Sequence, residues 1–305
     1  MPDKPLILFD HDGGVDDYLS IMLLMTYAHL EVLGIVVTPA DCYIGGAVGA
    51  TRKILDHMGR SDVPVAQSSV RGLYPFPREN RRDSICIDHF PNLNEREEIT
   101  TPLVEETGQS FMVNRLRSAP QPVTLLVTGP LSTVAAALDQ APDIEAKIER
   151  VLWMGGALNV PGNVRDSEHD GSAEWNVYWD PPSARRVWQT QVPLVICPLD
   201  ITNNVPLTST FIRQLSRQRR HPLSDLAGHC YALVSHQRYY FWDVLTTSYL
   251  GVPELFETRQ WETELLVDPP SQGRTLVRPG GRPVTALHTV DTAAFYNHML
   301  TQWRQ

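Results

Sequence analysis

Short apolar runs alternate with longer stretches of helical periodicity over the first two thirds of the chain. The apolar runs predict strands, at residues 5–9, 30–37, 123–127, 151–154 and 194–197. The stretches between them predict helices, at residues 17–29, 46–58, 108–117, 131–141 and 181–189. Regular alternation of strand and helix is typical of a parallel sheet that is covered by helices on both faces.

The last third of the chain has a different pattern. Three short apolar runs, at 262–267, 274–277 and 284–287, are separated by Pro and Gly turns, which favours antiparallel pairing. A final helix is predicted over 290–303. Because no linker and no internal repeat interrupts the pattern, residues 1–305 are predicted to form a single α/β domain. Its central sheet is mainly parallel and Rossmann-like, with helices on both faces and a small antiparallel extension.

Two segments lack this regularity. Residues 67–102 contain four prolines and several arginines and show neither the helical nor the strand periodicity of hydrophobic residues. A loop of that length inside a compact domain is usually a lid or part of a binding site, the alternative being an insertion with no role. Residues 229–242, rich in Tyr, His and Arg, are a second candidate for lining a pocket.

Composition narrows the class of protein. The 305 residues are 42% hydrophobic and 20% charged, with a net charge of −9, which excludes a disordered chain. A negative chain of this kind is not expected to bind nucleic acid, because phosphate neutralisation needs a basic face. No signal pattern opens the chain, and no apolar run is long enough to span a membrane. The four cysteines are scattered, so we expect reduced thiols in a cytoplasmic protein.

The strongest local signal is acidic, in the sequence DHDGGVDD of residues 10–17. It lies between a predicted strand and a predicted helix, at the edge of a parallel sheet where ligands bind. Its four carboxylates repel one another unless a cation compensates them. An all-oxygen donor set favours Ca²⁺ or Mg²⁺ over zinc. The plainer interpretation is that Asp16 caps the helix and the other three are solvated.

The same motif permits a second enzymatic interpretation. An apolar strand followed by Asp-x-Asp-Gly also resembles the Mg²⁺-dependent haloacid dehalogenase phosphohydrolases, with Asp10 as nucleophile and Asp12 as acid/base. That family has Thr or Val in place of Gly14 and does not need the Asp16–Asp17 pair. The rest of the sequence decides between the two.

Four further motifs follow in order: VTGPLS at 127–132, MGGA at 154–157, DGSAEWNVYWDP at 170–181 and YYFWD at 239–243. With these motifs the chain resembles the nucleoside hydrolases, calcium-dependent ribonucleoside N-ribohydrolases, over essentially its whole length. The opening motif, Ala40-Asp41-Cys42 and the Trp before Asp243 are most similar to the purine-specific inosine–adenosine–guanosine branch.

The resemblance implies a role for each matching residue. Ca²⁺ would be held by the side chains of Asp12, Asp17 and Asp243 and by the backbone carbonyl of Thr128. Asp10 would orient the turn that carries Asp12. The ribose hydroxyls would be bound by Asp16, Asn163, Glu174 and Asn176. Trp242 would stack on the base, and Asp41 would face the base. Asp12 would also be the general base for a calcium-bound water, and Asn176 would help to stabilise the positive charge that develops on the ribose.

The part of the predicted site that would bind the base departs from the pattern of the purine-specific branch. Asn80 stands where that branch has a second stacking Trp, and Gly14 stands where it has Asn. The segment between His236 and Tyr239 also looks shorter than usual, so the second lid is expected to be trimmed. His89 and Arg81 are candidates to approach the base instead.

The sequence therefore predicts hydrolysis of ribonucleosides, with a weakened preference for purines, to ribose and free base with inversion at the ribose. The substrate is a small molecule, a salvage role is expected, and family habit suggests a homodimer or homotetramer. The two alternatives are the phosphohydrolase and a catalytically inactive nucleoside-binding protein. The second would keep Glu174, Asn176 and Trp242 but lose turnover.

Overall fold

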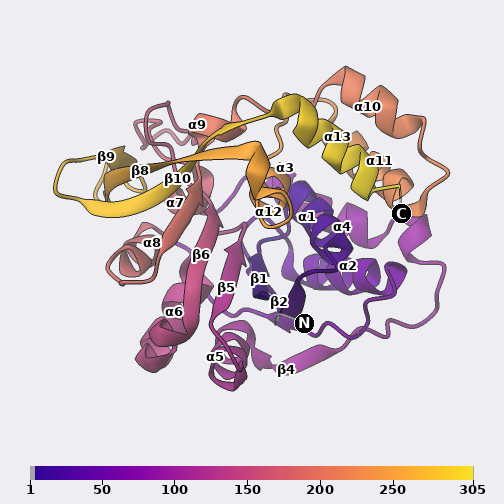
Figure 1. The fold of residues 1–305 in the computed structure, drawn as a ribbon, viewed down its shortest axis with the longest axis horizontal. Coiled ribbons are helices and arrows are strands. Elements are labelled where there is room, and N and C mark those ends of the chain that lie inside the picture. Colours follow the sequence, from indigo (N-terminus) through magenta and orange to yellow (C-terminus); the bar gives the residue numbers. More distant parts are fainter. Residues whose placement is uncertain (1–3, 305) are drawn as a thin grey trace.

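The computed structural model describes residues 4–304, whose ten strands form one continuous sheet (Figure 1). The sheet order is β4-β3-β2-β1-β5-β6-β7-β10-β8-β9. The strands are β1 Leu6–His11, β2 Glu31–Val37, β3 Val65–Gln67, β4 Leu103–Thr107, β5 Val123–Val127, β6 Ile148–Met154, β7 Leu194–Cys197, β8 Phe256–Leu265, β9 Thr275–Val277 and β10 Arg282–Val290.

Pairing is parallel from β4 through β7, and β10 joins β7 in the same direction. Only β8 runs against its neighbours, pairing antiparallel with β10 and with β9. The predicted mainly parallel sheet with a small antiparallel extension is thus confirmed. The last of the three tail strands is both antiparallel to β8 and parallel to β7, so it joins the extension to the main sheet.

Helices cover both faces of this sheet, as predicted (Figure 1). On one side, Ile7 and Phe9 of β1 belong to an apolar cluster that includes side chains of α1, α2, α11 and α13. On the other side, Leu6 and Leu8 belong to a cluster that includes side chains of α5, α6 and α8. The helices are α1 Val15–Thr26, α2 Ile44–His57, α3 Arg78–Arg81, α4 Asp83–Asp88, α5 Gly108–Ser118, α6 Ser132–Gln140, α7 Trp175–Tyr178, α8 Pro181–Trp188, α9 Leu199–Thr202, α10 Ser209–Ser216, α11 Pro222–Val234, α12 Asp243–Ser248 and α13 Thr292–Gln302. None of the described helices is long and apolar enough to cross a membrane.

The segment 67–102, predicted to lack regular structure, is in fact partly helical. It contains α3, α4 and a 3₁₀ turn at Pro91–Leu93, and its first residue ends β3. These helices are too short to show a period in the sequence. They are fixed to α2, where Lys53 Nζ lies 2.9 Å from Asp88 Oδ1 and donates to the Asp88 carbonyl at 2.8 Å. The segment is therefore an anchored cover rather than a free loop.

Several other expectations are corrected at their boundaries. The segment 229–242, predicted to line a pocket, begins inside α11, a helix that was not predicted. Two of the three tail strands are longer than predicted, β8 beginning at Phe256 and β10 at Arg282. The strand predicted at 5–9 continues to His11, which moves Asp10 into the sheet. Four consecutive residues of β8, 257–260, are polar and exposed, so the first half of the strand has no hydrophobic pattern that would predict it.

Candidate active site

The turn between β1 and α1 places the acidic motif at the carboxyl edge of the sheet, where β1 has β2 on one side and β5 on the other. Gly13 has φ +82°, and a Cβ there would lie 2.6 Å from Cys42 Cβ. Only glycine fits this turn without strain. The turn leaves Asp12 in the cavity wall and puts Asp16 and Asp17 into the first turn of α1, where the helix dipole favours negative charge.

Thr128 reaches the same place from the end of β5. Its backbone N–H donates to the carbonyl of Asp10 at 2.9 Å, and its hydroxyl donates to Asp17 Oδ1 in a short hydrogen bond. A Cβ on the following residue, Gly129, would lie 2.6 Å from Asp12 Cβ, so the two turns are in direct contact. Asp17 accepts a second hydrogen bond at Oδ2 from the N–H of Gly14, at 2.8 Å.

The segment after β6 supplies an amide and a carboxyl group. The side-chain nitrogen of Asn176 donates to the carbonyls of Thr128, at 2.9 Å, and Met154, at 3.1 Å. Glu174 accepts from the N–H groups of Asn176, at 2.9 Å, and Gly156, at 3.2 Å. Both side chains are almost fully buried and are held by backbone groups, so they are positioned before any ligand binds.

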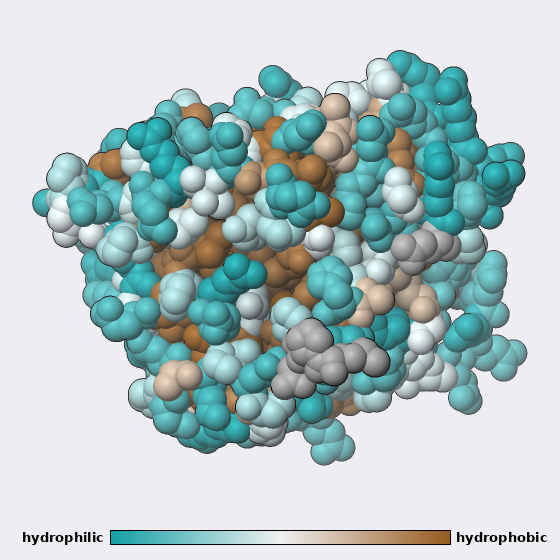
Figure 2. Space-filling model, in the orientation of Figure 1, coloured by the Kyte–Doolittle hydropathy of each residue, from teal (hydrophilic) through white to brown (hydrophobic). Residues whose placement is uncertain are grey.

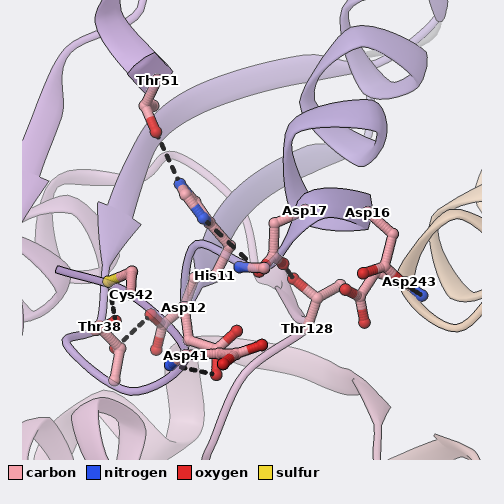
Figure 3. Close-up of polar contacts among 12 residues, drawn as sticks. His11, Asp12, Asp16, Asp17, Thr38, Asp41, Cys42, Thr51, Thr128 and Asp243 are labelled. Atoms are coloured by element: carbon pink, nitrogen blue, oxygen red, sulfur yellow. Dashed lines mark hydrogen bonds and ion pairs between the residues drawn. The ribbon is translucent and has the colours of Figure 1, made fainter. Parts of the chain in front are cut away.

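Two residues from late in the chain, Tyr239 and Asp243, complete the acidic site from a third direction. Tyr239 donates its hydroxyl proton to Asp16 Oδ1 at 2.7 Å, and the N–H of Asp243 donates to Asp16 Oδ2 at 3.1 Å. Figure 3 shows the side chains of six residues close together at the N-terminal end of α1: Asp12, Asp16, Asp17, Asp41, Thr128 and Asp243. Segments separated by more than 200 residues therefore meet at one point.

These groups line a cavity of about 290 Å³. Ten of the residues that the sequence predicted for the site line it: Asp12, Asp16, Asp41, Asn80, Thr128, Asn163, Glu174, Asn176, Trp242 and Asp243. Asp17 does not, because it is fully buried beneath the wall, where it contacts Thr128. Asp10 is also buried, where it accepts from the hydroxyl of Thr38 at 2.7 Å. The geometry thus brings the predicted set together.

The carboxyl groups of the site are buried close to one another, and this raises their pKa values. Burial, with the charges of Asp17 and Asp41 nearby, raises the pKa of Asp12 well above its ordinary value. Burial likewise raises the pKa of Asp243, which lies against Asp16, and brings that of Asp17 to about 6. Arg238 is the single cationic side chain among the described residues lining the cavity. In this structure the acidic charge is therefore largely uncompensated.

The donor chemistry at this site fits a divalent cation. The carboxyl groups of Asp12 and Asp17 lie within hydrogen-bonding reach of each other, as do those of Asp16 and Asp243. Two buried carboxylates this close require either a shared proton or a cation between them. Within residues 4–304, no three His, Cys, Asp or Glu side chains could by themselves hold a metal ion. A site here therefore also needs other oxygen donors, such as the Thr128 carbonyl.

His11 does not supply the missing positive charge. Its ring Nδ1 lies 4.0 Å from Asp17 Oδ2, but burial lowers the pKa of His11 to about 3. The neutral ring contacts Thr51 Oγ1 at 3.1 Å through Nε2 and packs against Phe9 and Tyr18. His11 is therefore a structural residue.

Aromatic side chains form another part of the wall. The Trp242 ring meets Tyr239 edge-on, with centroids 4.6 Å apart, and its Nε1 is buried without a partner in the described chain. Phe76 stacks on Trp175 at 5.1 Å, and both line the cavity. Trp242 is thus braced on one side by tyrosine and presents an unused hydrogen-bond donor.

Some residues that line the cavity were not predicted to belong to the site: Phe76, Asp83, Met154, Trp175, Val234, Gln237, Arg238 and Tyr239. The density of Tyr and Arg in 229–242 was the one signal that pointed toward some of them. His89, Arg81 and His236, considered as possible partners for the base, do not line the cavity. His89 and His236 are exposed, each with Nδ1 facing a carbonyl of its own segment.

Comparison with known proteins agrees with this fold. The family model for inosine-uridine preferring nucleoside hydrolases matches residues 7–297, and the chain belongs to that family. It is a ribonucleoside hydrolase whose substrates are small nucleosides and whose family depends on a divalent metal. This membership decides against both the phosphohydrolase and the inactive binding protein.

Individual relatives carry different base preferences. The crystal structure of an inosine-uridine preferring nucleoside hydrolase from Bacillus anthracis is 38% identical, with a TM-score of 0.96, covering 98% of this chain and 99% of that one. The pyrimidine-specific ribonucleoside hydrolase RihA of Citrobacter koseri is 28% identical over 95% of each chain. A purine-preferring enzyme from Gardnerella vaginalis, 24% identical with a TM-score of 0.79 and 98% coverage of each chain, shares the fold. The family prediction is confirmed, and the branch stays a prediction.

Proposed function

We propose that the chain hydrolyses the N-glycosidic bond of both purine and pyrimidine ribonucleosides, with Ca²⁺ as its cofactor. The observation that carries the proposal is the cavity itself, which brings buried carboxyl and amide groups and an aromatic ring, Trp242, into one wall. The first set suits a ribose with its hydroxyls, and the ring suits a planar base.

The oxygen-only donors of Asp12, Asp17, Asp243 and the Thr128 carbonyl would hold Ca²⁺, a hard cation that prefers such ligands. When bound, the cation would supply a water that is easier to deprotonate and an anchor for ribose hydroxyls. Asp12 would accept the proton of the attacking water. The raised pKa of its carboxyl falls once a cation balances the neighbouring charges, which restores the basic form near neutral pH.

Asn176 and its neighbours would bind and polarise the ribose. The nitrogen of Asn176 is engaged by two carbonyls, and no described residue donates to its Oδ1. That oxygen is thus free to face the positive charge that develops on the sugar as the bond to the base breaks. Asp16, Glu174 and Asn163 would accept or donate to ribose hydroxyls.

The base would stack on Trp242, with Asp41 beside it. Asp41 Oδ1 is buried and without a partner among the described residues, so it is free to accept a hydrogen bond from the base. Because Asn80 stands in place of a second Trp, the cavity wall lacks one of the aromatic side chains that would stack on the base in the purine-specific branch. Broad base preference is also in keeping with the inosine-uridine and pyrimidine-specific relatives.

The test is ribose release from inosine, adenosine, uridine and cytidine by the same enzyme preparation, before and after metal removal. We expect hydrolysis of at least one purine and one pyrimidine nucleoside, lost on chelation and restored by Ca²⁺. Restoration by Mg²⁺ alone would overturn the calcium assignment. Turnover confined to purines would overturn the broad preference.

A further inference from the structure

A second hollow lies between α10, the turn at 217–221 that leads into α11, and α13, and it shares no residue with the active-site cavity. It is an open groove of about 730 Å³, into which Arg217, Arg220, His221 and Arg304 project as lining residues. The region lies close to the C-terminal end of the described chain (Figure 1), and its surface is strongly hydrophilic in Figure 2. We refer to it as the arginine groove.

Positive charge in the arginine groove is not balanced locally. None of its three arginines lies within 4.0 Å of an Asp or Glu among residues 4–304, although the whole chain carries a net charge of −9. No acidic residue occurs between Asp200 and Asp225, a stretch that contains five arginines and histidines in nine positions, 213–221. Like charges gathered in this way repel one another, so an anion that enters the groove lowers the free energy of the protein.

One arginine is held in place by a neutral partner. Gln218 is only 7% exposed, and in the amide orientation that satisfies both of its groups its oxygen accepts from Arg304 Nε at 3.0 Å and Nη2 at 2.9 Å. Its nitrogen then donates to the Leu300 carbonyl at 2.9 Å. Arg220 Nε contacts His221 Nε2 at 3.4 Å. The Gln218 contacts hold the guanidinium group of Arg304 without cancelling its charge, which lowers the entropy cost of binding a ligand there.

We propose that the arginine groove binds a phosphate group, either free or as the monoester of a small metabolite. Planar guanidinium groups pair with phosphate oxygens through two parallel hydrogen bonds, and the side-chain amides of Gln214 and Asn297 beside them add neutral donors. The site is separate from the hydrolytic one, and a phosphate bound there need not meet the nucleoside. The proposal does not depend on which base the enzyme prefers.

The experiment is calorimetric titration of the protein with its metal in place, at low ionic strength, with inorganic phosphate, with glycerol 2-phosphate and with glycerol. The test variant is Arg217→Gln combined with Arg220→Gln. The matched control is Arg213→Gln combined with Arg219→Gln, which removes the same charge from the same segment but from side chains outside the groove. All four arginines are exposed, so both variants should fold, as the melting temperature will show.

We expect saturable binding of at least one phosphate probe and none of glycerol. Affinity should fall about tenfold or more in the groove variant, because two charge-assisted contacts are lost, and less than about threefold in the control. Tighter binding of glycerol 2-phosphate than of phosphate would identify a monoester as the ligand, and the reverse would identify the free ion. Absence of saturable binding to the wild type, or an equal loss in the two variants, would overturn the proposal.

Discussion

Asn80 is the residue on which base preference most depends. It lines the cavity from α3, where the purine-specific branch has Trp, and it is half-buried. Stacking of a base on an aromatic side chain is worth ~1–3 kcal/mol. Asn80→Trp should therefore raise kcat/KM for inosine by about fivefold or more, with a smaller gain for uridine.

The control for that substitution is Glu79→Trp. Glu79 is the neighbouring residue in α3, but it is exposed and does not line the cavity. The two variants and the wild type are compared in side-by-side assays of inosine and uridine. If Asn80→Trp gives no gain, another aromatic residue such as Phe76 already closes the site. If Glu79→Trp gives the same gain, the gain does not come from stacking in the cavity.

Glu174 carries a pH signature of its own. Burial raises its pKa to about 7, against 4.5 for an unperturbed glutamate, despite hydrogen bonds from Asn176 and Gly156. The folded state therefore holds this proton more tightly than the unfolded state does. The resulting stabilisation is fully present below about pH 4.5 and is lost as pH rises through 7.

Glu174→Gln should remove that dependence. Between pH 5 and pH 8, the metal-free wild type should lose about 2–3 kcal/mol more unfolding free energy than the variant, from a shift of between two and three pKa units. Urea unfolding of both proteins at the two pH values measures the difference. Parallel pH profiles for the two proteins would show that the Glu174 carboxyl titrates normally.

At the scale of elements, Asp56 ties the end of the 67–102 segment to α2. It accepts hydrogen bonds from the N–H and hydroxyl groups of Thr100 and Thr101 at 2.7–2.8 Å, and from the hydroxyl of Ser61 at 2.9 Å. Burial alone would raise its pKa, but these donors lower it to about 2. The charged form stabilises the fold above about pH 4, and this contribution disappears as pH falls toward 2.

Asp56→Asn should therefore lower the unfolding free energy by about 2 kcal/mol at pH 7, and by progressively less as the pH falls below 4. Asp62→Asn is the control, because Asp62 is exposed and paired only with Arg60, and such pairs contribute little. Chemical unfolding at pH 7 and pH 3.5 measures both. An equal effect of the two substitutions, or one independent of pH, would contradict the role given to Asp56.

The sequence predicts elements well where burial is continuous and poorly where elements are short or exposed. The strands at 123–127 and 194–197 agree with β5 and β7 residue for residue, because all of their side chains are buried and all but Thr124 are apolar. By contrast β3 has three residues, and β4 is largely exposed, so neither stands out from the surrounding polar sequence. The four-residue helices α3, α7 and α9 are missed for the same reason.

At the scale of the whole molecule, the site depends on a meeting of segments that no local pattern specifies. The acidic motif at 10–17 predicts a cation site because four carboxylates so close together repel one another unless a cation compensates them. The contact between Tyr239 and Asp16, by contrast, joins residues 223 positions apart and is visible only in the folded chain. Phe76, Gln237 and Arg238 likewise become lining residues through the packing of loops.

This clustering also predicts a dependence of global stability on metal. Emptying the site leaves the buried Asp12, Asp17 and Asp243 carboxyls to repel one another, so the metal-free protein should melt at a lower temperature. A cation that binds only the folded state stabilises it in proportion to the logarithm of its concentration. Differential scanning calorimetry across a Ca²⁺ series at neutral pH measures this. A melting temperature that does not change with Ca²⁺ or with chelator would contradict a structural metal site.

The central claim is that Asp12 activates water at this cavity to break the bond between ribose and base. The most direct measurement is kcat for inosine and uridine in wild type and Asp12→Asn, both saturated with Ca²⁺, with nucleoside binding to each determined by calorimetry. Asparagine keeps the shape and one oxygen ligand but cannot accept the proton. The account predicts that kcat falls at least ~10²-fold while nucleoside affinity stays largely unchanged. Near wild-type turnover in Asp12→Asn would show that the base lies elsewhere and would contradict the account.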